Sequence, residues 1–227
     1  MGKVILISGI DTGVGKTVAT GLMARYLMKR NVKVATIKLV QTGNVGFSED
    51  RDEHRRLMGV TLPEDAGNLT APQIFAFPAS PHLAAKLEKR TVDTERIRSA
   101  CRELAARYDI VLAEGAGGLA VPLTEELLTA DFAAGEHYPL ILVSSGKLGS
   151  LNHTILSLEC AASRKMRVLG IVFNHAPGAD PEIDADSMRM MEKYLVRYGF
   201  PPAAVRVPEV GEALPDVDFS PLFAGMI

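Results

Sequence analysis

The feature that most constrains the fold is a glycine-rich stretch near the amino terminus of the 227-residue chain. The apolar, β-branched run 4–7 predicts a buried strand, and apolar residues at helical spacing begin after Lys16. Glycines between a strand and a helix, followed by Lys16 and Thr17, are typical of a phosphate-binding loop. This order predicts a nucleoside triphosphate site, with Lys16 at the β- and γ-phosphates and the Thr17 hydroxyl on Mg²⁺.

The loop departs from the usual pattern in one respect. Five residues separate Gly9 from Gly15, where the usual pattern has four. A glycine-rich turn before a surface helix is the alternative, but the preceding strand favours the phosphate-binding loop. We therefore expect the backbone N–H groups of residues 13–17 to point into one concavity.

The composition is ordinary for a soluble globular protein: 47% of residues are hydrophobic, 23% are charged and the formal net charge is −2. The sequence has no basic block, no signal-like segment and no long apolar stretch. Nucleic acid and membranes are therefore not expected as partners, and a cytoplasmic location is expected. Cys101 and Cys160 lack metal-ligand spacing and are expected to be small buried hydrophobic residues in predicted helices.

Strand and helix patterns alternate and predict a single α/β domain over residues 1–227, with a mainly parallel sheet covered by helices on both faces. The expected strands are 4–7, 32–38, 109–113, 140–144, 167–173 and 205–207. The first expected helix begins at Lys16. Further helices are expected over 50–58, 81–88, 94–108, 152–163 and 184–198. The proline-rich stretch 62–81 is expected to be an ordered loop without an element of its own.

Polar or glycine-rich clusters follow most of the expected strands. In a parallel sheet the loops after the strands lie along one edge, where ligands bind. These clusters are 9–17, 38–42, 114–118, 144–152 and Asn174. Their convergence predicts an active site at that edge. The five histidines, at 54, 82, 137, 153 and 175, show no ligand spacing.

Several of these polar residues have both a chemical and a structural interpretation. Glu114 ends a strand, where an unpaired carboxylate is costly, so a Mg²⁺ ligand is favoured over a helix cap. Lys38 is either a solvated strand end or a group that stabilises charge on the γ-phosphoryl group. Asp50 and Asp52 lie near a helix start, as caps or as a further Mg²⁺ ligand. Asn174 either starts a turn or pairs with adenine.

Five motifs occur in a fixed order along nearly the whole chain. They are Gly-Ile-Asp-Thr-Gly-Val-Gly-Lys-Thr at 9–17, Lys-Leu-Val-Gln-Thr-Gly at 38–43, Ser-Pro-His at 80–82, Glu-Gly-Ala-Gly-Gly at 114–118 and Lys-Leu-Gly-Ser-Leu-Asn-His at 147–153. As a set they resemble the dethiobiotin synthetase family, which shares the five-residue spacing of the phosphate loop. The resemblance implies a P-loop NTPase fold and an ATP-dependent cyclo-ligase.

The resemblance also implies the reaction. An amine of 7,8-diaminopelargonic acid captures CO₂ as a carbamate, ATP phosphorylates the carbamate to a mixed anhydride, and the second amine expels phosphate to close the ureido ring of dethiobiotin. Such chemistry depends on positioning and charge neutralisation more than on a protein nucleophile. Lys16 and Lys38 would be the catalytic residues, at the phosphates and the carbamate.

The remaining roles carry over position by position from the resemblance. ATP would contact Gly13, Val14, Gly15, Lys16, Thr17, Val18, Glu114, Gly115, Ala116, Gly117, Asn174, Pro208, Glu209 and Val210. The substrate would contact Thr42, Gly149, Ser150, Leu151 and Asn152. Thr17, Glu114 and either Asp50 or Asp52 would hold Mg²⁺, and alignment without a gap prefers Asp50. The family is a homodimer with its substrate near the subunit interface, so a homodimer is expected.

Two positions depart from the family pattern. Leu39 stands where the family usually has Pro, which is expected to leave the loop after Lys38 less rigid. Gly13 stands where some members have an acidic residue, so no side chain at that position helps to bind Mg²⁺. Neither departure changes the assignment.

Two other classes of protein share this fold. A partitioning-type ATPase switch usually carries a second Lys early in the loop, where this chain has Asp11, and no basic or amphipathic carboxyl-terminal helix is predicted. A cobyrinate-amidase-like synthetase domain needs an attached glutamine-hydrolysing domain, for which 227 residues leave no space. The enzyme is therefore the favoured interpretation.

Overall fold

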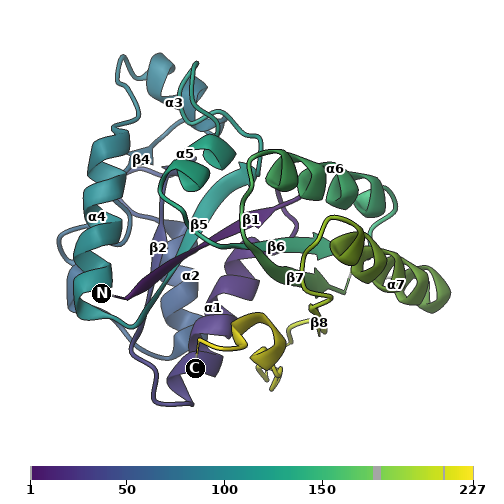
Figure 1. Cartoon of the computed structure of the whole chain (residues 1–227). Coiled ribbons are helices and arrows are strands. Elements are labelled where there is room, and N and C mark those ends of the chain that lie inside the picture. Colours follow the sequence, from purple (N-terminus) through teal and green to yellow (C-terminus); the bar gives the residue numbers. More distant parts are fainter. Residues whose placement is uncertain (1, 176–179, 212, 227) are drawn as a thin grey trace.

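The computed structural model describes residues 2–175, 180–211 and 213–226, and a six-stranded parallel sheet forms its centre (Figure 1). The strands lie in the order β2-β5-β1-β6-β7-β8. Their bounds are β1 Lys3–Gly9, β2 Val34–Lys38, β5 Ile110–Gly118, β6 Leu140–Ser145, β7 Val168–Asn174 and β8 Ala204–Val207. Every neighbouring pair is parallel, which confirms the predicted sheet.

Helices cover both faces of this sheet, as predicted (Figure 1). One face carries α1 Lys16–Met28 and α2 Glu49–Met58, and the other carries α4 Thr94–Arg107, α5 Thr129–Gly135, α6 Ser150–Ser163 and α7 Pro181–Arg197. Side chains alternate between the two cores along β5: Ile110 and Leu112 pack with α1, whereas Val111 packs on the opposite face. The same alternation directs Glu114 toward α1 and α2.

Helix α2 packs directly against α1 because Gly21 has no side chain. A Cβ atom at Gly21 would lie 2.7 Å from the Cβ of Leu57, closer than two such atoms approach. The bare backbone of α1 therefore sets the position of α2, which carries Asp50.

Arg55 connects α2 to β2 and to a 3₁₀ turn, Pro63–Asp65. Its Nε and Nη2 atoms donate to the two carboxylate oxygens of Asp65 at 2.7 and 2.8 Å. Its Nη1 atom donates to the Thr36 hydroxyl at 2.6 Å. The guanidinium is 7% exposed and paired in a fork geometry, which is the arrangement in which a buried arginine is tolerated.

The expectation that 62–81 forms no element is wrong. This stretch contains the 3₁₀ turn and β4 Ile74–Phe75, which pairs in parallel with β3 Gln41–Thr42, before α3 Pro81–Leu87 begins. Two-residue strands carry no readable periodicity, and their pairing depends on a contact distant in sequence. Helix α5 and the 3₁₀ turn Ser220–Phe223 were also not predicted. Strand β5 runs on to Gly118, although glycines disfavour strands.

Cysteine placement agrees with expectation at one position only. Cys101 is buried in α4, whereas Cys160 in α6 is only partly buried. The Cys160 Sγ atom accepts a hydrogen bond from Arg164 Nη1 at 3.3 Å. The expectation of a buried Cys160 is therefore wrong. Among the helices within the described ranges, none has the length and apolar character that crossing a membrane requires.

The Arg55–Asp65 pair predicts a pH-dependent stability. Burial raises the pKa of Asp65, but hydrogen bonds from Arg55, Thr70 and the Leu62 amide outweigh burial and lower the pKa to about 2. An unfolded Asp titrates near pH ~3.9, so the carboxylate stabilises the folded protein above that pH, and this contribution is lost as the pH falls toward about 2. We expect Asp65→Asn to lower the free energy of unfolding by about 2 kcal/mol at neutral pH.

Chemical denaturation over a pH series measures this effect. The difference between Asp65→Asn and the unmodified protein should shrink as the pH falls from about 4 to about 2. The exposed Asp186, which pairs with Arg189 on the surface of α7, supplies the control Asp186→Asn, with an expected change within about 0.5 kcal/mol. A difference for Asp65→Asn that stays constant over this pH range would contradict the assignment.

Candidate active site

The phosphate loop connects β1 to α1 and leaves the start of the helix open. Gly13 and Gly15 have φ angles of 71° and 87°, in the left-handed region that favours glycine. Gly15 is the N-cap of α1, and no side chain caps the helix there. The first backbone N–H groups of α1 are therefore available to an anion, as the sequence predicts.

Asn174, the last residue of β7, contacts the backbone of this loop. Its Nδ2 atom donates to the carbonyl oxygens of Val14 at 2.7 Å and Gly15 at 3.3 Å. A Cβ atom at Gly15 would lie 2.4 Å from the same Nδ2 atom, so only glycine permits the contact. The Asn174 Oδ1 atom is buried and has no hydrogen-bond partner among the described residues. That oxygen is the atom left to accept from a base amino group, and adenine binding by Asn174 stays a prediction.

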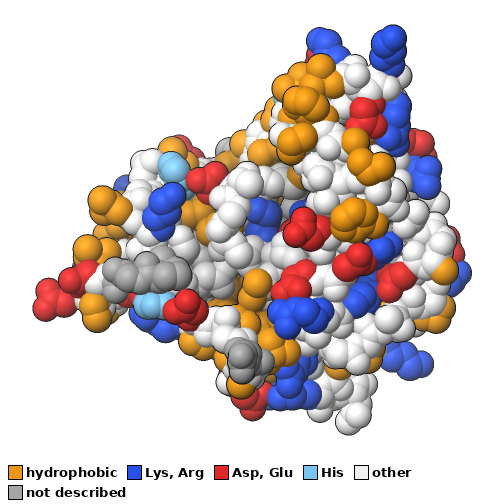
Figure 2. All heavy atoms as spheres, turned by 180° about the vertical axis from the view of Figure 1, so that it is seen from behind, with side chains coloured by type: hydrophobic (Ala, Val, Ile, Leu, Met, Phe, Trp, Pro, Cys, Tyr) orange, Lys and Arg blue, Asp and Glu red, His pale blue; other side chains and the backbone are white. Residues whose placement is uncertain are grey.

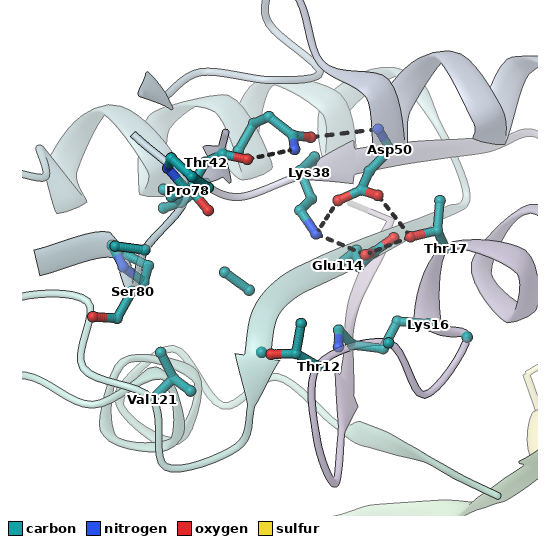
Figure 3. Close-up of a pocket in the computed structure, with 18 residues that line it drawn as sticks. Thr12, Lys16, Thr17, Lys38, Thr42, Asp50, Pro78, Ser80, Glu114 and Val121 are labelled. Carbon is teal, nitrogen blue, oxygen red and sulfur yellow. Dashed lines mark hydrogen bonds and ion pairs between the residues drawn. The ribbon is translucent and has the colours of Figure 1, made fainter. Parts of the chain in front are cut away.

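A buried cluster of opposite charges lies beside the loop (Figure 3). Lys38 and Glu114 are register partners on β2 and β5, so their side chains lie on the same face. The Lys38 Nζ atom lies 2.7 Å from Glu114 Oε1 and 2.5 Å from Asp50 Oδ2. The Thr17 hydroxyl, from the first turn of α1, lies 2.9 Å from Asp50 Oδ1 and 3.1 Å from Glu114 Oε1.

Mutual neutralisation keeps this cluster charged. Burial lowers the pKa of Lys38, but Glu114 and Asp50 outweigh burial and raise it. Burial raises the pKa of Glu114, but the Lys38 ammonium and His54 outweigh burial and hold it well below its usual range. The Lys38 side chain is 5% exposed, so the interpretation of Lys38 as a solvated strand end is wrong.

Lys16 adds a second ammonium group to the same cavity. Burial and the neighbouring charge of Lys38 lower the pKa of Lys16 to about 8. Its Nζ atom donates to the Asp11 carbonyl at 3.0 Å. Two ammonium groups beside an open helix start form a site suited to a polyanion.

Sequence reasoning missed His54. This side chain is fully buried, and its Nε2 atom lies 2.6 Å from Glu114 Oε2. The available signal was its position on α2, one helical turn after Asp50, which places both side chains on one face of the helix. This spacing belongs neither to a metal-ligand pattern nor to a Ser-His-Asp arrangement, the two histidine patterns that the sequence was tested for.

The charged cluster and the loop border a cavity of about 640 Å³, a size typical of small-molecule sites. Thr42, Pro78 and Ser80 line the side opposite Lys16 and Thr17 (Figure 3). The predicted site residues that line this cavity are Gly13, Gly15, Lys16, Thr17, Lys38, Thr42, Asp50, Glu114, Ala116 and Gly117. Loops after β1, β2 and β5 therefore converge as expected.

Other predicted site residues lie outside the lining of this cavity. They are Val14, Val18, Gly115, Asn174, Pro208, Glu209, Val210 and the segment 149–152. Asn174 pairs in register with Val207, so the residues that follow β8 lie beside it, at the same edge of the sheet. Asp52 is 53% exposed and pairs with Arg51, so the structure brings Asp50, not Asp52, to the cluster.

The donor set fits Mg²⁺. Among the described residues, no group of three or more His, Cys, Asp and Glu side chains is placed to hold a metal ion. Mg²⁺ at a phosphate loop needs fewer protein side chains, because one or two carboxylates bind it together with a hydroxyl, phosphate oxygens and water. Thr17, Asp50 and Glu114 supply such oxygens, and a cationic ammonium already lies among them.

Leu39 does not loosen the loop that follows β2. Its side chain is fully buried in the core, and its backbone N–H donates to the Glu114 carbonyl at 3.0 Å. Proline has no N–H group and cannot make this hydrogen bond. The expectation of reduced rigidity at Leu39 is therefore not supported.

The fold and this site define a P-loop nucleotide-binding protein, and comparison with known proteins narrows the class. A family model described as an AAA domain matches residues 3–209. The ATP-dependent dethiobiotin synthetase BioD of Chlorobaculum tepidum is 51% identical over 205 residues, which cover 90% of this chain and 86% of that protein. The ATP-dependent dethiobiotin synthetase BioD 2 of Pasteurella multocida is 46% identical over 199 residues, which cover 87% of this chain and 93% of that protein. The chain belongs to the ATP-dependent dethiobiotin synthetase family.

A solved structure of a ParA family ATPase from Chlorobium tepidum shares the fold. Its TM-score is 0.53 at 16% sequence identity, over 100% of this chain and 91% of that one. Identity this low shows a common architecture alone. The predicted family is thus confirmed, and the partitioning-ATPase alternative is not favoured.

The contact between Gly15 and Asn174 yields a test of the loop. We expect Gly15→Ala to displace the Asn174 amide and to weaken ATP binding strongly, because the added Cβ would meet Nδ2 at 2.4 Å. Gly13→Ala is the matched control: it shares a positive φ angle, but nothing lies within 4 Å of its Cβ. Gly13→Ala should cost only the left-handed strain, about 1–2 kcal/mol.

Fluorescence titration with a labelled ATP analogue, together with thermal unfolding, separates the two variants. Equal ATP affinities for Gly15→Ala and Gly13→Ala would show that the Asn174 contact does not shape the loop.

Proposed function

We propose that this chain closes the ureido ring of dethiobiotin from 7,8-diaminopelargonic acid, CO₂ and ATP. The chain belongs to this family, and the observation that carries the proposal is its buried Lys38 ammonium, which lies between Asp50 and Glu114. The ammonium borders the cavity onto which the phosphate loop opens. A positive charge fixed at this position can stabilise the negative charge that develops during phosphoryl transfer.

The loop and the charged cluster would bind the nucleotide and its metal. Backbone N–H groups from Gly13 to Thr17 would hold the phosphates, with Lys16 at the β- and γ-phosphates. Thr17, Asp50 and Glu114 would hold Mg²⁺, which when bound neutralises charge on the phosphate oxygens. Glu114 to Gly117 would border the nucleotide from β5.

The adenine end of ATP would lie along the edge of the sheet formed by β7 and β8. Asn174 and residues 208–210 are the groups proposed to hold it. The register pairing of Asn174 with Val207 supports this assignment, because it brings these two segments together beside the phosphate loop.

The opposite side of the cavity would take the second substrate. Thr42 and Ser80 line that side, and Lys38, Asp50 and Glu114 border the same cavity (Figure 3). A carbamate formed on the diamine would lie near Lys38, which would hold its carboxylate and orient it toward the γ-phosphoryl group. No protein nucleophile is needed, because the oxygen of the carbamate attacks phosphorus and the second amine later displaces phosphate.

A homodimer would complete this site. The proposed substrate-binding segment 149–152 borders a separate hollow of about 380 Å³, next to Leu148, which is 88% exposed. Exposed apolar side chains also occur at Val45, Phe47, Phe77, Leu83 and Leu87. Figure 2 shows hydrophobic side chains gathered at the top of the molecule, where Figure 1 has α3. These surfaces support contact with a second copy, whose segment 149–152 would reach the cavity. A cytoplasmic location stays a prediction.

The activity is tested by mass spectrometry of dethiobiotin together with measurement of ADP. We expect one ADP for each dethiobiotin, and little ADP when diaminopelargonic acid is omitted. ATP hydrolysis that proceeds equally without this substrate would contradict the proposal.

Lys38→Leu tests the role of the buried ammonium. We expect kcat to fall by about 10²–10³ while Mg-ATP still binds, because the charge matters most in the transition state. Lys38→Gln should do little better, since it also lacks the charge. Lys29→Leu is the control, because Lys29 lies at the carboxyl end of α1 with a side chain that is 47% exposed.

The comparison is made at high CO₂, so that carbamate formation does not limit the rate. A Lys38→Leu rate within a few fold of the unmodified protein would remove Lys38 from the chemical step.

A further inference from the structure

His54 is a fully buried side chain to which the proposed reaction assigns no task. It lies on α2, and its Nε2 atom is 2.6 Å from Glu114 Oε2, with neither side chain exposed. The two residues are 60 positions apart in sequence. A buried polar side chain with so short a contact to a proposed metal ligand points to a role in the site.

The contacts divide the Glu114 carboxylate into two ends. Oε1 faces the cluster, at 2.7 Å from Lys38 Nζ and 3.1 Å from Thr17 Oγ1. Oε2 faces away, and its one hydrogen-bond partner among the described residues is His54. A carboxylate held at one oxygen cannot rotate freely, so Oε1 stays directed into the cluster, where Mg²⁺ would lie.

Hydrogen bonding assigns the proton of the imidazole. His54 Nδ1 is buried and has no partner among the described residues. A buried N–H group without an acceptor is costly, so the arrangement with the proton on Nε2 and a bare lone pair on Nδ1 is favoured. His54 Nε2 then donates to Glu114 Oε2.

Helix α2 supplies both a proposed metal ligand and this donor. Asp50 and His54 lie one turn apart on the same face, and both reach the Lys38–Glu114 pair. Arg55, the next residue, fixes the helix to Asp65 and to β2. The helix is therefore held rigidly while it presents the two side chains.

We propose that His54 is a positioning residue that holds Glu114 Oε2 and thereby directs Oε1 at the metal ion. This inference rests on the proposed metal role of Glu114. Groups that orient metal ligands in this way typically contribute 10–100-fold to metal affinity, to the order of magnitude. The role does not require His54 to touch the metal, the nucleotide or the substrate.

The test uses two substitutions at one position in the full-length protein. His54→Leu removes the donor at similar volume, whereas His54→Gln keeps an N–H donor that can reach Oε2. Mn²⁺ affinity is measured by electron paramagnetic resonance in the presence of a non-hydrolysable ATP analogue. We expect His54→Leu to bind Mn²⁺ about 10–100-fold more weakly and His54→Gln to stay within a few fold of the unmodified protein.

A second measurement separates positioning from general disruption. Binding of the analogue without metal should be unchanged in His54→Leu, and the exposed His137 supplies a control, His137→Asn. Unchanged Mn²⁺ affinity in His54→Leu, or equal losses in His54→Leu and His54→Gln, would overturn the proposal. An equal loss of metal-free nucleotide binding would do the same.

Two further observations keep the test decisive. If His54→Leu does not fold, ¹⁵N spectra of histidine-labelled unmodified protein still report the proton: Nε2 protonation supports the proposal, and Nδ1 protonation overturns it. Glu114→Gln distinguishes a failure of the proposed metal role of Glu114 from a failure of the proposed positioning role of His54. If Glu114→Gln leaves Mn²⁺ affinity unchanged, the proposed metal role of Glu114 fails; if it weakens Mn²⁺ while His54→Leu does not, only the role of His54 fails.

Discussion

The pairing of one buried ammonium with two carboxylates is the interaction on which the site depends. Lys38, Glu114 and Asp50 come from β2, β5 and α2, and the buried charges of Lys38 and Glu114 are tolerated because they pair with each other. Replacing Lys38 by a neutral residue leaves the buried Glu114 carboxylate without its ammonium partner, which is why such a cluster fixes the relative positions of its elements. The same geometry that stabilises these charges presents oxygen atoms and an ammonium group to the cavity beside the phosphate loop.

Register in the parallel sheet places these groups. Because β2 and β5 pair with Lys38 opposite Glu114, both side chains emerge on the α1–α2 face at the carboxyl end of their strands. Strand β1 ends at the same edge, and the loop after it lies next to Glu114. Gly21 lets α2 approach α1 closely enough for Asp50 to meet Thr17. Strand order, register and one glycine together bring residues from four elements into contact.

Part of this arrangement could be predicted from the sequence, for identifiable reasons. The phosphate loop, Lys38 and Glu114 follow apolar strands, so their position at one edge of a parallel sheet was readable. The Arg55–Asp65 pair and the His54–Glu114 contact were not, because they depend on how α2 is turned against the sheet. Strands β3 and β4 have two residues each, too few for any periodic signal. The end of β5 was not predicted because glycines disfavour strands, although pairing with the neighbouring strands stabilises a strand there.

The missed strands β3 and β4 bear on what separates a synthetase from other proteins of this fold. A ParA family ATPase shares the architecture at 16% identity, so the sheet and the phosphate loop alone do not distinguish the two classes. In this chain, Thr42 at the end of β3 and the segment 78–81 after β4 form the side of the cavity opposite the phosphate loop. Hydrolysis of a nucleotide requires only water beside the γ-phosphate, whereas ring closure requires room for a diamine and its carbamate. A cavity of about 640 Å³, bounded on one side by the phosphate loop and on the other by this added pair of strands, provides that room.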